Sequence, residues 1–459
     1  MALIKSISGI RGTIGNKPGE NLTPVDIVKF TASFAAVIKG KKDHIRMVVG
    51  RDGRISGPMV QQLVVSTLVA MGIEVIDLGL STTPTVEMAV TAAGADGGII
   101  ITASHNPREW NALKLLNEKG EFIDAMLGAL VLSLAEQEKF SFASVDQLGS
   151  VSAADYKEYH LDAILQYPLV DAQRIAEKKY KVVVDAINST GALYVPALLQ
   201  RLGVQEVIVL NKEVNGQFAH SPEPLPENLQ SLCQEVVRQG ADLGIAVDPD
   251  VDRLCFVNED GTLFGEEYTL VAVADYVLSK RPGYTVSNLS STKSLKEISL
   301  AKGGKYASAA VGEVNVVAKM KEVQAVIGGE GNGGVIVPDF HYGRDALIGI
   351  ALFMTHLATS GKKCSQFRKQ YPDYVISKNK IELAPGTHLA AIFDSISKKY
   401  AQHPQYTEDG LKIEFGNDWV HLRSSNTEPI IRIYAESDLE DKAAALAQQL
   451  MRDINEFSN

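Results

Sequence analysis

Three aspartates, Asp248, Asp250 and Asp252, alternate with single residues directly after the apolar run at 243–247. In an extended or turning loop, this spacing points the three carboxylates to one side. A hard cation would relieve their mutual repulsion, and oxygen-only ligands favour Mg²⁺ or Ca²⁺ over zinc. A solvated acidic turn is the alternative, but the place of the loop after a buried strand favours metal binding. Arg253, the next residue, could hold a phosphate.

A second polar loop, Thr-Ala-Ser-His-Asn-Pro at 102–107, follows the apolar run at 98–101. Loops at the carboxyl ends of strands in α/β sheets often hold catalytic groups. Taken alone, Ser104 could cap a following helix, His105 could be a structural histidine and Lys114 a solvated lysine. A serine loop together with a three-carboxylate loop suggests phosphoryl transfer through a phosphoserine.

Two further loops could bind the rest of a sugar phosphate. Residues 328–334, Gly-Gly-Glu-Gly-Asn-Gly-Gly, let a ligand approach the backbone, and Glu330 and Asn332 suit neighbouring sugar hydroxyls. A plain flexible turn is the alternative. Residues 423–429, Arg-Ser-Ser-Asn-Thr-Glu-Pro, offer a guanidinium, small polar side chains and backbone N–H groups, which suit a phosphate dianion, and Arg432 could add a second cation. A polar hairpin explains that turn but not the arginine that opens it.

Composition limits the class of protein. A chain of 459 residues should hold roughly three domains, or four small ones. A net charge of −10 argues against nucleic acid as the main partner. No apolar stretch reaches the roughly 20 residues that cross a bilayer, and the start lacks a secretory pattern. Three cysteines without paired spacing fit a reducing compartment, so we expect a cytoplasmic protein without a membrane partner.

The apolar pattern alternates between strand-length and helix-length segments. Strand, helix and strand follow each other at 45–49, 58–71 and 74–78, at 181–185, 191–202 and 206–210, and at 284–289, 294–302 and 325–327. This order predicts βαβ units, largely parallel sheets and three related α/β domains. The C-terminal region instead predicts an α+β module, with strands at 378–383, 411–415, 419–423 and 430–435 and helices at 389–400 and 439–456.

In this order, the loops resemble those of the α-D-phosphohexomutase superfamily, whose members interconvert sugar 6-phosphates and 1-phosphates. The resemblance covers essentially the whole chain and includes Ser-Gly-Ile-Arg-Gly at 8–12. It implies four domains in a heart shape around a central cleft. We therefore expect three related α/β domains with mixed sheets plus a smaller C-terminal α+β domain. The expected boundaries are 1–155 with the phosphoserine loop, 156–258 with the magnesium loop, 259–368 with the sugar loop and 369–459 with the phosphate loop.

The resemblance also implies roles for individual residues. Ser104 would carry the phosphate and complete a magnesium site with Asp248, Asp250 and Asp252. Glu330 and Asn332 would contact the sugar hydroxyls. The non-reacting phosphate would be held by a clamp of Arg423, Ser425, Asn426 and Thr427, with Arg432 nearby. The reacting phosphoryl group would be surrounded by Arg11, His105, Lys114 and Arg253, with Lys114 as candidate general acid or base.

The sequence departs from the commonest family pattern at two positions. Pro249 stands where glycine is usual, and Gly334 stands where many members have a histidine that His341 could replace. The glycine-rich form, with Glu-Trp-Asn-Ala-Leu-Lys at 109–114, looks most like the phosphoglucosamine mutase branch. The resemblance therefore implies glucosamine 6-phosphate as substrate, with glucose and mannose phosphates as alternatives, Mg²⁺ as cofactor and a hexose 1,6-bisphosphate as intermediate and activator, in a monomer or homodimer. The rival functions are a phosphatase with a phosphoserine intermediate and a sugar-phosphate sensor without catalysis.

Overall fold

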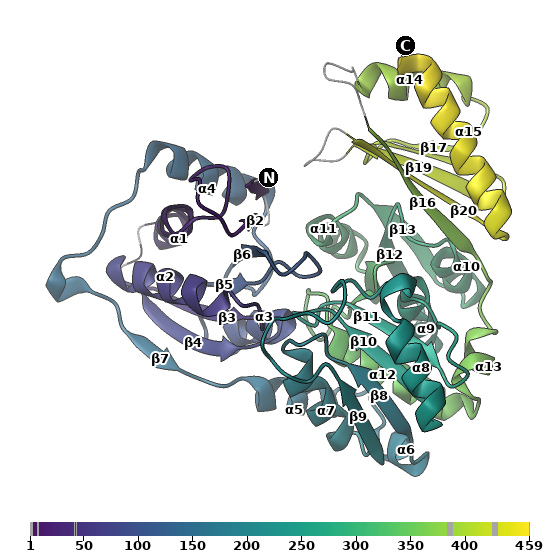
Figure 1. The fold of residues 1–459 in the computed structure, drawn as a ribbon, viewed down its shortest axis with the longest axis horizontal. Helices are drawn as coiled ribbons and strands as arrows, with labels where there is room; N and C mark the ends of the chain where they lie inside the picture. The colour runs from purple at the N-terminus through teal and green to yellow at the C-terminus, as the bar shows by residue number, and fades with distance from the viewer. Residues whose placement is uncertain are drawn as a thin grey trace.

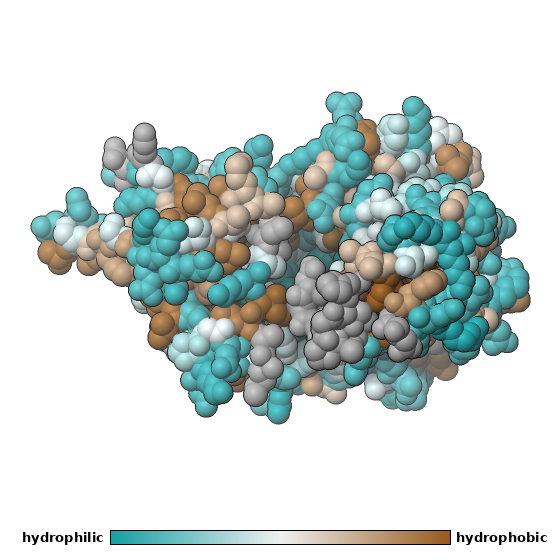
Figure 2. All heavy atoms as spheres, turned by 90° about the horizontal axis from the view of Figure 1, so that it is seen from above, coloured by the Kyte–Doolittle hydropathy of each residue, from teal (hydrophilic) through white to brown (hydrophobic). Residues whose placement is uncertain are grey.

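The computed structural model describes residues 3–6, 9–40, 42, 44–382, 389–424 and 430–458. The chain forms four sheets, which lie in four successive parts of the sequence (Figure 1). Across the described residues, no helix combines the length and the apolar character needed to cross a bilayer. Seen from above, hydrophilic side chains cover most of the surface, and hydrophobic ones form small separate patches (Figure 2).

The first domain contains a sheet of seven strands in the order β1-β2-β6-β5-β3-β4-β7. Its strands are β1 Ile4–Ser6, β2 Gly9–Thr13, β3 Arg46–Arg51, β4 Glu74–Leu80, β5 Gly97–Ile101, β6 Trp110–Leu116 and β7 Val151–Ala153. Its helices are α1 Pro24–Lys39, α2 Gly57–Ala70, α3 Thr83–Ala92 and α4 Ala125–Gln137. Buried apolar side chains form one core on each face of this sheet.

The second and third domains each contain a four-stranded sheet. The second has β8 Lys181–Asp185, β9 Glu206–Leu210, β10 Leu243–Val247 and β11 Leu254–Asn258, with α5 Lys157–Gln166, α6 Ala172–Glu177, α7 Gly191–Arg201 and α8 Gln230–Gln239. The third has β12 Tyr284–Asn288, β13 Lys305–Ala309, β14 Ile327–Glu330 and β15 Gly334–Ile336, with α9 Glu266–Lys280, α10 Ser294–Ala301, α11 Glu313–Val323, α12 Ala346–Ser360 and α13 Cys364–Arg368.

The three domains share one strand order: β6-β5-β3-β4, β11-β10-β8-β9 and β15-β14-β12-β13. In each, three strands are parallel and the first in this order is antiparallel. The antiparallel strand always follows the last parallel strand through a short loop. Those three loops are the serine loop, the aspartate loop and the glycine-rich loop, so they occupy equivalent positions in three related domains.

The C-terminal domain has a fully antiparallel sheet in the order β16-β20-β19-β18-β17. Its elements are β16 Val375–Glu382, α14 Leu389–Lys399, β17 Gln405–Tyr406, β18 Leu411–Phe415, β19 Asp418–Ser424, β20 Ile430–Ser437 and α15 Glu440–Ser458. Apolar residues of both helices pack on the sheet and form a separate core. The predicted strands at 411–415, 419–423 and 430–435 are confirmed.

The second and third domains share a single core, which runs from Leu161 to Tyr371. Helix α12 of the third domain contacts α5, α6 and α7 of the second as well as α9 of its own domain. Within this core, the rings of Phe353 and Phe256 stack with centroids 3.7 Å apart. Burial on all sides explains why α12 is apolar around its whole circumference.

Two sequence expectations about elements are wrong. The serine loop is followed by strand β6, not by a helix that Ser104 could cap. Strand β6 is buried at almost every position, so its sequence shows no alternation that would separate a strand from a buried helix. The third predicted βαβ unit is also misplaced. It joins the helix at 294–302 directly to a strand at 325–327, but β13 and α11 lie between them, and β14 starts at Ile327.

Candidate active site

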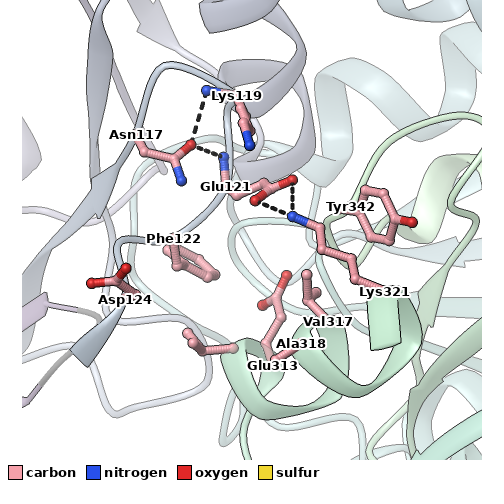
Figure 3. Close-up of a pocket in the computed structure, with 11 residues that line it drawn as sticks. Asn117, Lys119, Glu121, Phe122, Asp124, Glu313, Val317, Ala318, Lys321 and Tyr342 are labelled. Carbon is pink, nitrogen blue, oxygen red and sulfur yellow. Dashed lines mark hydrogen bonds and ion pairs between the residues drawn. The ribbon is translucent and has the colours of Figure 1, made fainter. Parts of the chain in front are cut away.

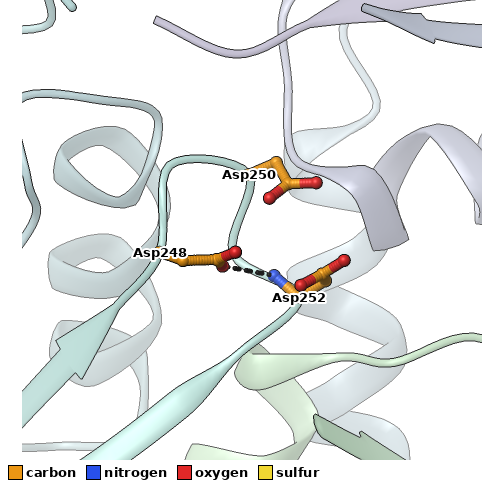
Figure 4. Close-up of side chains that lie close together, drawn as sticks. All are labelled: Asp248, Asp250 and Asp252. Atoms are coloured by element: carbon orange, nitrogen blue, oxygen red, sulfur yellow. Dashed lines mark hydrogen bonds between the residues drawn. The ribbon is translucent and has the colours of Figure 1, made fainter. Parts of the chain in front are cut away.

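The three aspartates of the loop between β10 and β11 converge (Figure 4). One carboxylate oxygen from each of Asp248, Asp250 and Asp252 lies within 4.8 Å of the others, and all three residues are buried. Within the described part of the chain, Oδ1 of Asp250 and Oδ1 of Asp252 are buried without a hydrogen-bond partner. Buried carboxylate oxygens without a donor are costly unless a cation binds them. The site therefore fits a divalent cation with oxygen ligands.

The backbone of this loop is held in an uncommon conformation. Val251 has a φ of 62°, which a β-branched residue rarely adopts. The carbonyl of Pro249 accepts hydrogen bonds from the hydroxyls of Ser189, at 2.6 Å, and Thr190, at 2.8 Å. These bonds tie the loop to the start of α7.

Two side chains of the first domain, Lys114 and Thr83, hold the Oδ2 oxygens of Asp250 and Asp252. Lys114 Nζ donates to Oδ2 of Asp250 at 2.7 Å and to Oδ2 of Asp252 at 3.1 Å. Thr83 donates to the same oxygen of Asp250 at 2.5 Å. Burial lowers the pKa of Lys114, but the charges of Asp250 and Asp252 outweigh burial and raise this pKa above its ordinary value. Lys114 is therefore an ammonium group that helps to orient the aspartates.

Ser104 lies against the aspartates. Its hydroxyl donates to Oδ2 of Asp248 at 2.6 Å, across 144 residues of sequence. Its backbone φ is 48°, in the left-handed region, and its N–H donates to Oγ1 of Thr102 at 2.9 Å. Non-glycine residues held in this region cluster at functional sites. Burial, followed by Asp252 and Asp250, raises the pKa of Asp248 well above its ordinary value.

Arg54 shapes the serine loop, and sequence reasoning missed it. Its buried guanidinium donates to the carbonyls of Ser104, Asn106, Pro107 and Trp110. Oδ2 of Asp52 accepts from its Nε at 3.1 Å. The available signal was the segment Gly-Arg-Asp-Gly-Arg at 50–54, which follows an apolar strand run as the other loops do.

One cleft brings together residues from three domains. A cavity of about 440 Å³ has a polar lining that includes Arg11, His105, Lys114, Arg253, Glu330, Asn332 and Arg344. Arg11 donates to Asn106 Oδ1 at 2.8 Å, and Arg253 donates to Glu223 Oε1 at 2.8 Å. Burial and the charges of Arg253 and Arg11 lower the pKa of His105 well below its ordinary value, so His105 is neutral near pH 7. The cleft thus presents several cations beside Ser104, as phosphoryl transfer requires.

Glu330 and Asn332 face this cleft from the loop between β14 and β15. Oε1 of Glu330 accepts from Asn288 Nδ2 at 2.8 Å and from the N–H of Gly312 at 3.0 Å. Oε2 accepts from Arg344 Nη1 at 2.7 Å. Burial raises the pKa of Glu330, but Arg344, the hydrogen bond from Asn288 and the charge of Arg253 together outweigh burial, and the net shift is downward. Glu330 is therefore an ionised acceptor in a fixed orientation.

Comparison with known families accounts for nearly the whole chain. Models of the four phosphoglucomutase/phosphomannomutase domains match residues 3–141, 158–261 and 265–374 as alpha/beta/alpha domains I to III, and residues 380–453 as the C-terminal domain. The chain belongs to the phosphoglucomutase/phosphomannomutase family. It is a phosphohexomutase, an enzyme of the isomerase class.

Individual relatives of this phosphohexomutase align over almost their full length. A phosphoglucomutase/phosphomannomutase of Thermococcus kodakarensis is 37% identical over 95% of this chain and 94% of its own. A probable phosphoglucosamine mutase of Methanopyrus kandleri is 32% identical over 97% and 96%. The crystal structure of a family protein from Burkholderia thailandensis superposes with a TM-score of 0.84 at 26% identity, over 100% of this chain and 99% of that one.

The C-terminal domain of the phosphohexomutase stands apart from the cleft. Ser425, Asn426 and Thr427 of the expected clamp lie outside the described residues. Arg423 ends β19, and its Nε donates to Asp409 Oδ2 at 2.7 Å. Arg432 is exposed on β20 and pairs in register with Arg423. In the part of the chain that the structure describes, no residue of this domain lines the cleft.

His341, the candidate replacement for the missing histidine at 334, does not line the cleft. Its Nε2 lies 3.1 Å from Asp345 Oδ2, and its Nδ1 lies 3.4 Å from Glu87 Oε2. Asp345 also contacts His160 at 2.9 Å. Glu87, His160 and Asp345 are buried and His341 is half-buried, and together these four groups connect the first three domains.

A smaller cavity of about 270 Å³ adjoins the cleft between the first and third domains (Figure 3). Both cavities are lined by Phe122, Glu313 and Val314. At its edge, Lys321 pairs with Glu121 at 2.6 Å and lies over the ring of Tyr342. This contact holds the two walls of the cleft together.

The three cysteines are free, and Cys255 and Cys364 are buried, as expected for thiols without a catalytic role.

Proposed function

We propose that this phosphohexomutase moves a phosphoryl group between the 6- and 1-positions of a hexose through a phosphorylated Ser104. The observation that supports this proposal most directly is the 2.6 Å hydrogen bond from Ser104 to Asp248. It lies beside two buried oxygens, Oδ1 of Asp250 and Oδ1 of Asp252, that have no hydrogen-bond partner among the described residues. A nucleophile, a cation site and a cationic cleft thus meet at one point. A sensor would need neither the serine nor the free oxygens.

Asp248, Asp250 and Asp252 would hold Mg²⁺ together with an oxygen of the phosphoserine. Bound there, the cation supplies positive charge to the transferring phosphoryl group. In the first step, the bond from phosphorus to the Ser104 oxygen breaks, a bond from phosphorus to the free sugar hydroxyl oxygen forms, and the hydroxyl proton is transferred to the freed Ser104 oxygen. The resulting bisphosphate turns over and returns its other phosphoryl group to Ser104. Arg11, Arg253 and His105 would bind the phosphoryl oxygens.

Lys114 is the candidate proton-transfer group in this scheme. Its raised pKa keeps it protonated, so it is a charge-stabilising ammonium group that could take part in proton transfer only after giving up its own proton. Arg423, Ser425, Asn426, Thr427 and Arg432 would hold the non-reacting phosphate after the C-terminal domain approaches the cleft. Such closure would exclude water and protect the phosphoserine from hydrolysis.

Glucosamine 6-phosphate is the substrate that we favour, with glucose and mannose phosphates as alternatives. A relative from Sulfurisphaera tokodaii with 31% identity over 98% of this chain is a phosphoglucosamine/phosphogalactosamine mutase. Two carboxylates, Glu313 and Glu330, line the cleft. Carboxylates suit both the hydroxyls and the ammonium group of an amino sugar.

Intact mass measurement tests the phosphoserine. The protein is measured before and after glucose 1,6-bisphosphate with Mg²⁺, and the modified peptide is mapped by fragmentation. We expect one added phosphate on Ser104, none in Ser104→Ala and a parent-like result in Ser133→Ala, which changes a half-buried serine on α4. Release of inorganic phosphate without isomerisation would instead indicate a phosphatase, and absence of phosphorylation in the parent would refute the scheme.

A further inference from the structure

Arg344 is a buried arginine that the scheme above leaves without a role. It lies between β15 and α12, is 8% exposed and lines the cleft. Its guanidinium contacts three carboxylates at once: Asp252 Oδ2 at 2.8 Å, Glu330 Oε2 at 2.7 Å and Glu313 Oε2 at 3.1 Å. It therefore joins a predicted metal ligand to a predicted sugar contact.

The geometry of these contacts requires an arginine. The planar guanidinium presents its nitrogens in a rigid fork, so Nη1 and Nη2 donate to Glu330 and Asp252, and Nε forms an ion pair with Glu313 without a hydrogen bond. A lysine ammonium has one nitrogen and could not span the same three acceptors. With Oδ2 of Asp252 held by Arg344 and Lys114, Oδ1 has no hydrogen-bond partner among the described residues, lies 4.0 Å from Arg253 Nε and is available to a cation.

Gly334 provides the space for Arg344. A Cβ atom added at Gly334 would lie 2.3 Å from Cδ and 3.0 Å from Cγ of Arg344. These atoms are in the middle of a side chain whose end is fixed by three carboxylates, so they cannot move aside without breaking those contacts. Position 334 can therefore carry a side chain only if Arg344 leaves its place.

We propose that Arg344 is a positioning residue that aligns Glu330 for the sugar and Asp252 for the metal, and that Gly334 is required because it leaves room for Arg344. The inference rests on the proposed function, since it takes a hexose phosphate as the ligand of Glu330. Arg344 acts through the two carboxylates, so its loss should weaken sugar binding as well as turnover. Residues that orient metal and substrate ligands in this way typically contribute about 10- to 100-fold to affinity or activity.

Binding can be separated from turnover in a Ser104→Ala background, which cannot form the phosphoserine. Calorimetry would give the Kd of glucosamine 6-phosphate and of glucose 6-phosphate, each with Mg²⁺ and with chelator. We expect Arg344→Ala, Arg344→Lys and Gly334→Ala to raise the Kd about 10-fold or more. Arg201→Lys, which changes an arginine of α7 bound to Glu158 and Asp162, should leave the Kd unchanged.

Two comparisons distinguish positioning from a general loss of structure. Methylguanidinium should partly restore binding to Arg344→Ala but not to Gly334→Ala, in which the arginine side chain is still present. Gly334→Ala retains every charge, so it decides the matter if Arg344→Ala does not fold. A Kd within twofold of the parent in folded Gly334→Ala and Arg344→Lys would overturn the inference. If the Ser104→Ala parent binds neither sugar phosphate, the proposed substrate class fails instead.

Discussion

The two carboxylate oxygens of Asp250 have different surroundings. Its Oδ2 accepts hydrogen bonds from Thr83 and Lys114, while its Oδ1 is buried without a hydrogen-bond partner in the described structure. Asp250→Asn keeps the shape but removes the charge that a cation needs, so we expect the Mg²⁺ concentration for half-maximal activity to rise at least about 10-fold. Titration of initial rates with Mg²⁺ measures this, with the exposed Asp146→Asn as control. An unchanged metal requirement would remove Asp250 from the ligand set.

Residues with recognisable chemistry could be located from the sequence, whereas those that hold them could not. Arg11, Lys114 and Arg253 line the cleft where they were expected. Arg54 and Arg344 escaped prediction because each is defined by long-range contacts. Arg54 binds carbonyls about fifty residues away, and Arg344 binds an aspartate 92 residues away. An arginine beside an aspartate has no local signal that distinguishes it from a surface ion pair.

Among the elements, β19 joins the C-terminal domain to the third domain through a buried histidine. His421 Nδ1 accepts from Ser290 Oγ at 2.8 Å, and its Nε2–H donates to the carbonyl of Asp409 at 2.6 Å. Burial lowers the pKa of His421 from 6.5 to about 4. Because the unfolded chain binds a proton below pH 6.5 and the folded one does not, stability should fall between pH 6.5 and about 4, by at most about 3 kcal/mol.

Thermal unfolding of the parent and of His421→Gln at several pH values tests this expectation. Between pH 7 and pH 4.5, the melting temperature of the parent should fall further than that of His421→Gln, because glutamine does not titrate. His403→Gln, four residues after the end of α14, is the matched control and should behave like the parent. Equal losses in the parent and His421→Gln would mean that His421 does not control the acid sensitivity.

The sequence pattern predicted most helices and strands, but it did not predict the antiparallel strand that completes each set of three parallel strands. Strand β15 has three residues, β6 is buried at almost every position and β11 at all of them, so neither length nor alternation marks these strands. Their direction depends on the tight loops that precede them, and these loops are the functional ones. Mixed sheets could therefore be expected only from the family resemblance.

For the whole molecule, the distance of the C-terminal domain from the cleft predicts a conformational change. Arg423 is bound to Asp409, and the described residues that line the cleft come from the first three domains only. If the proposed clamp is right, both phosphates of a bisphosphate would be held only when the fourth domain approaches. We expect glucose 1,6-bisphosphate with Mg²⁺ to reduce the radius of gyration of Ser104→Ala in small-angle X-ray scattering. Inorganic phosphate with Mg²⁺ is the control, and an unchanged radius would mean that the clamp residues do not reach the substrate.

The shared core of the second and third domains has a consequence for how the chain melts. Helix α12 buries apolar side chains against both domains, and Phe353 stacks on Phe256 across the boundary. Neither domain could lose its packing without exposing the other. A calorimetric scan should therefore resolve fewer cooperative transitions than the four sheets suggest, with the second and third domains absorbing heat as one unit. A fragment of residues 156–258 made alone should expose this surface and aggregate, whereas residues 156–374 should stay soluble.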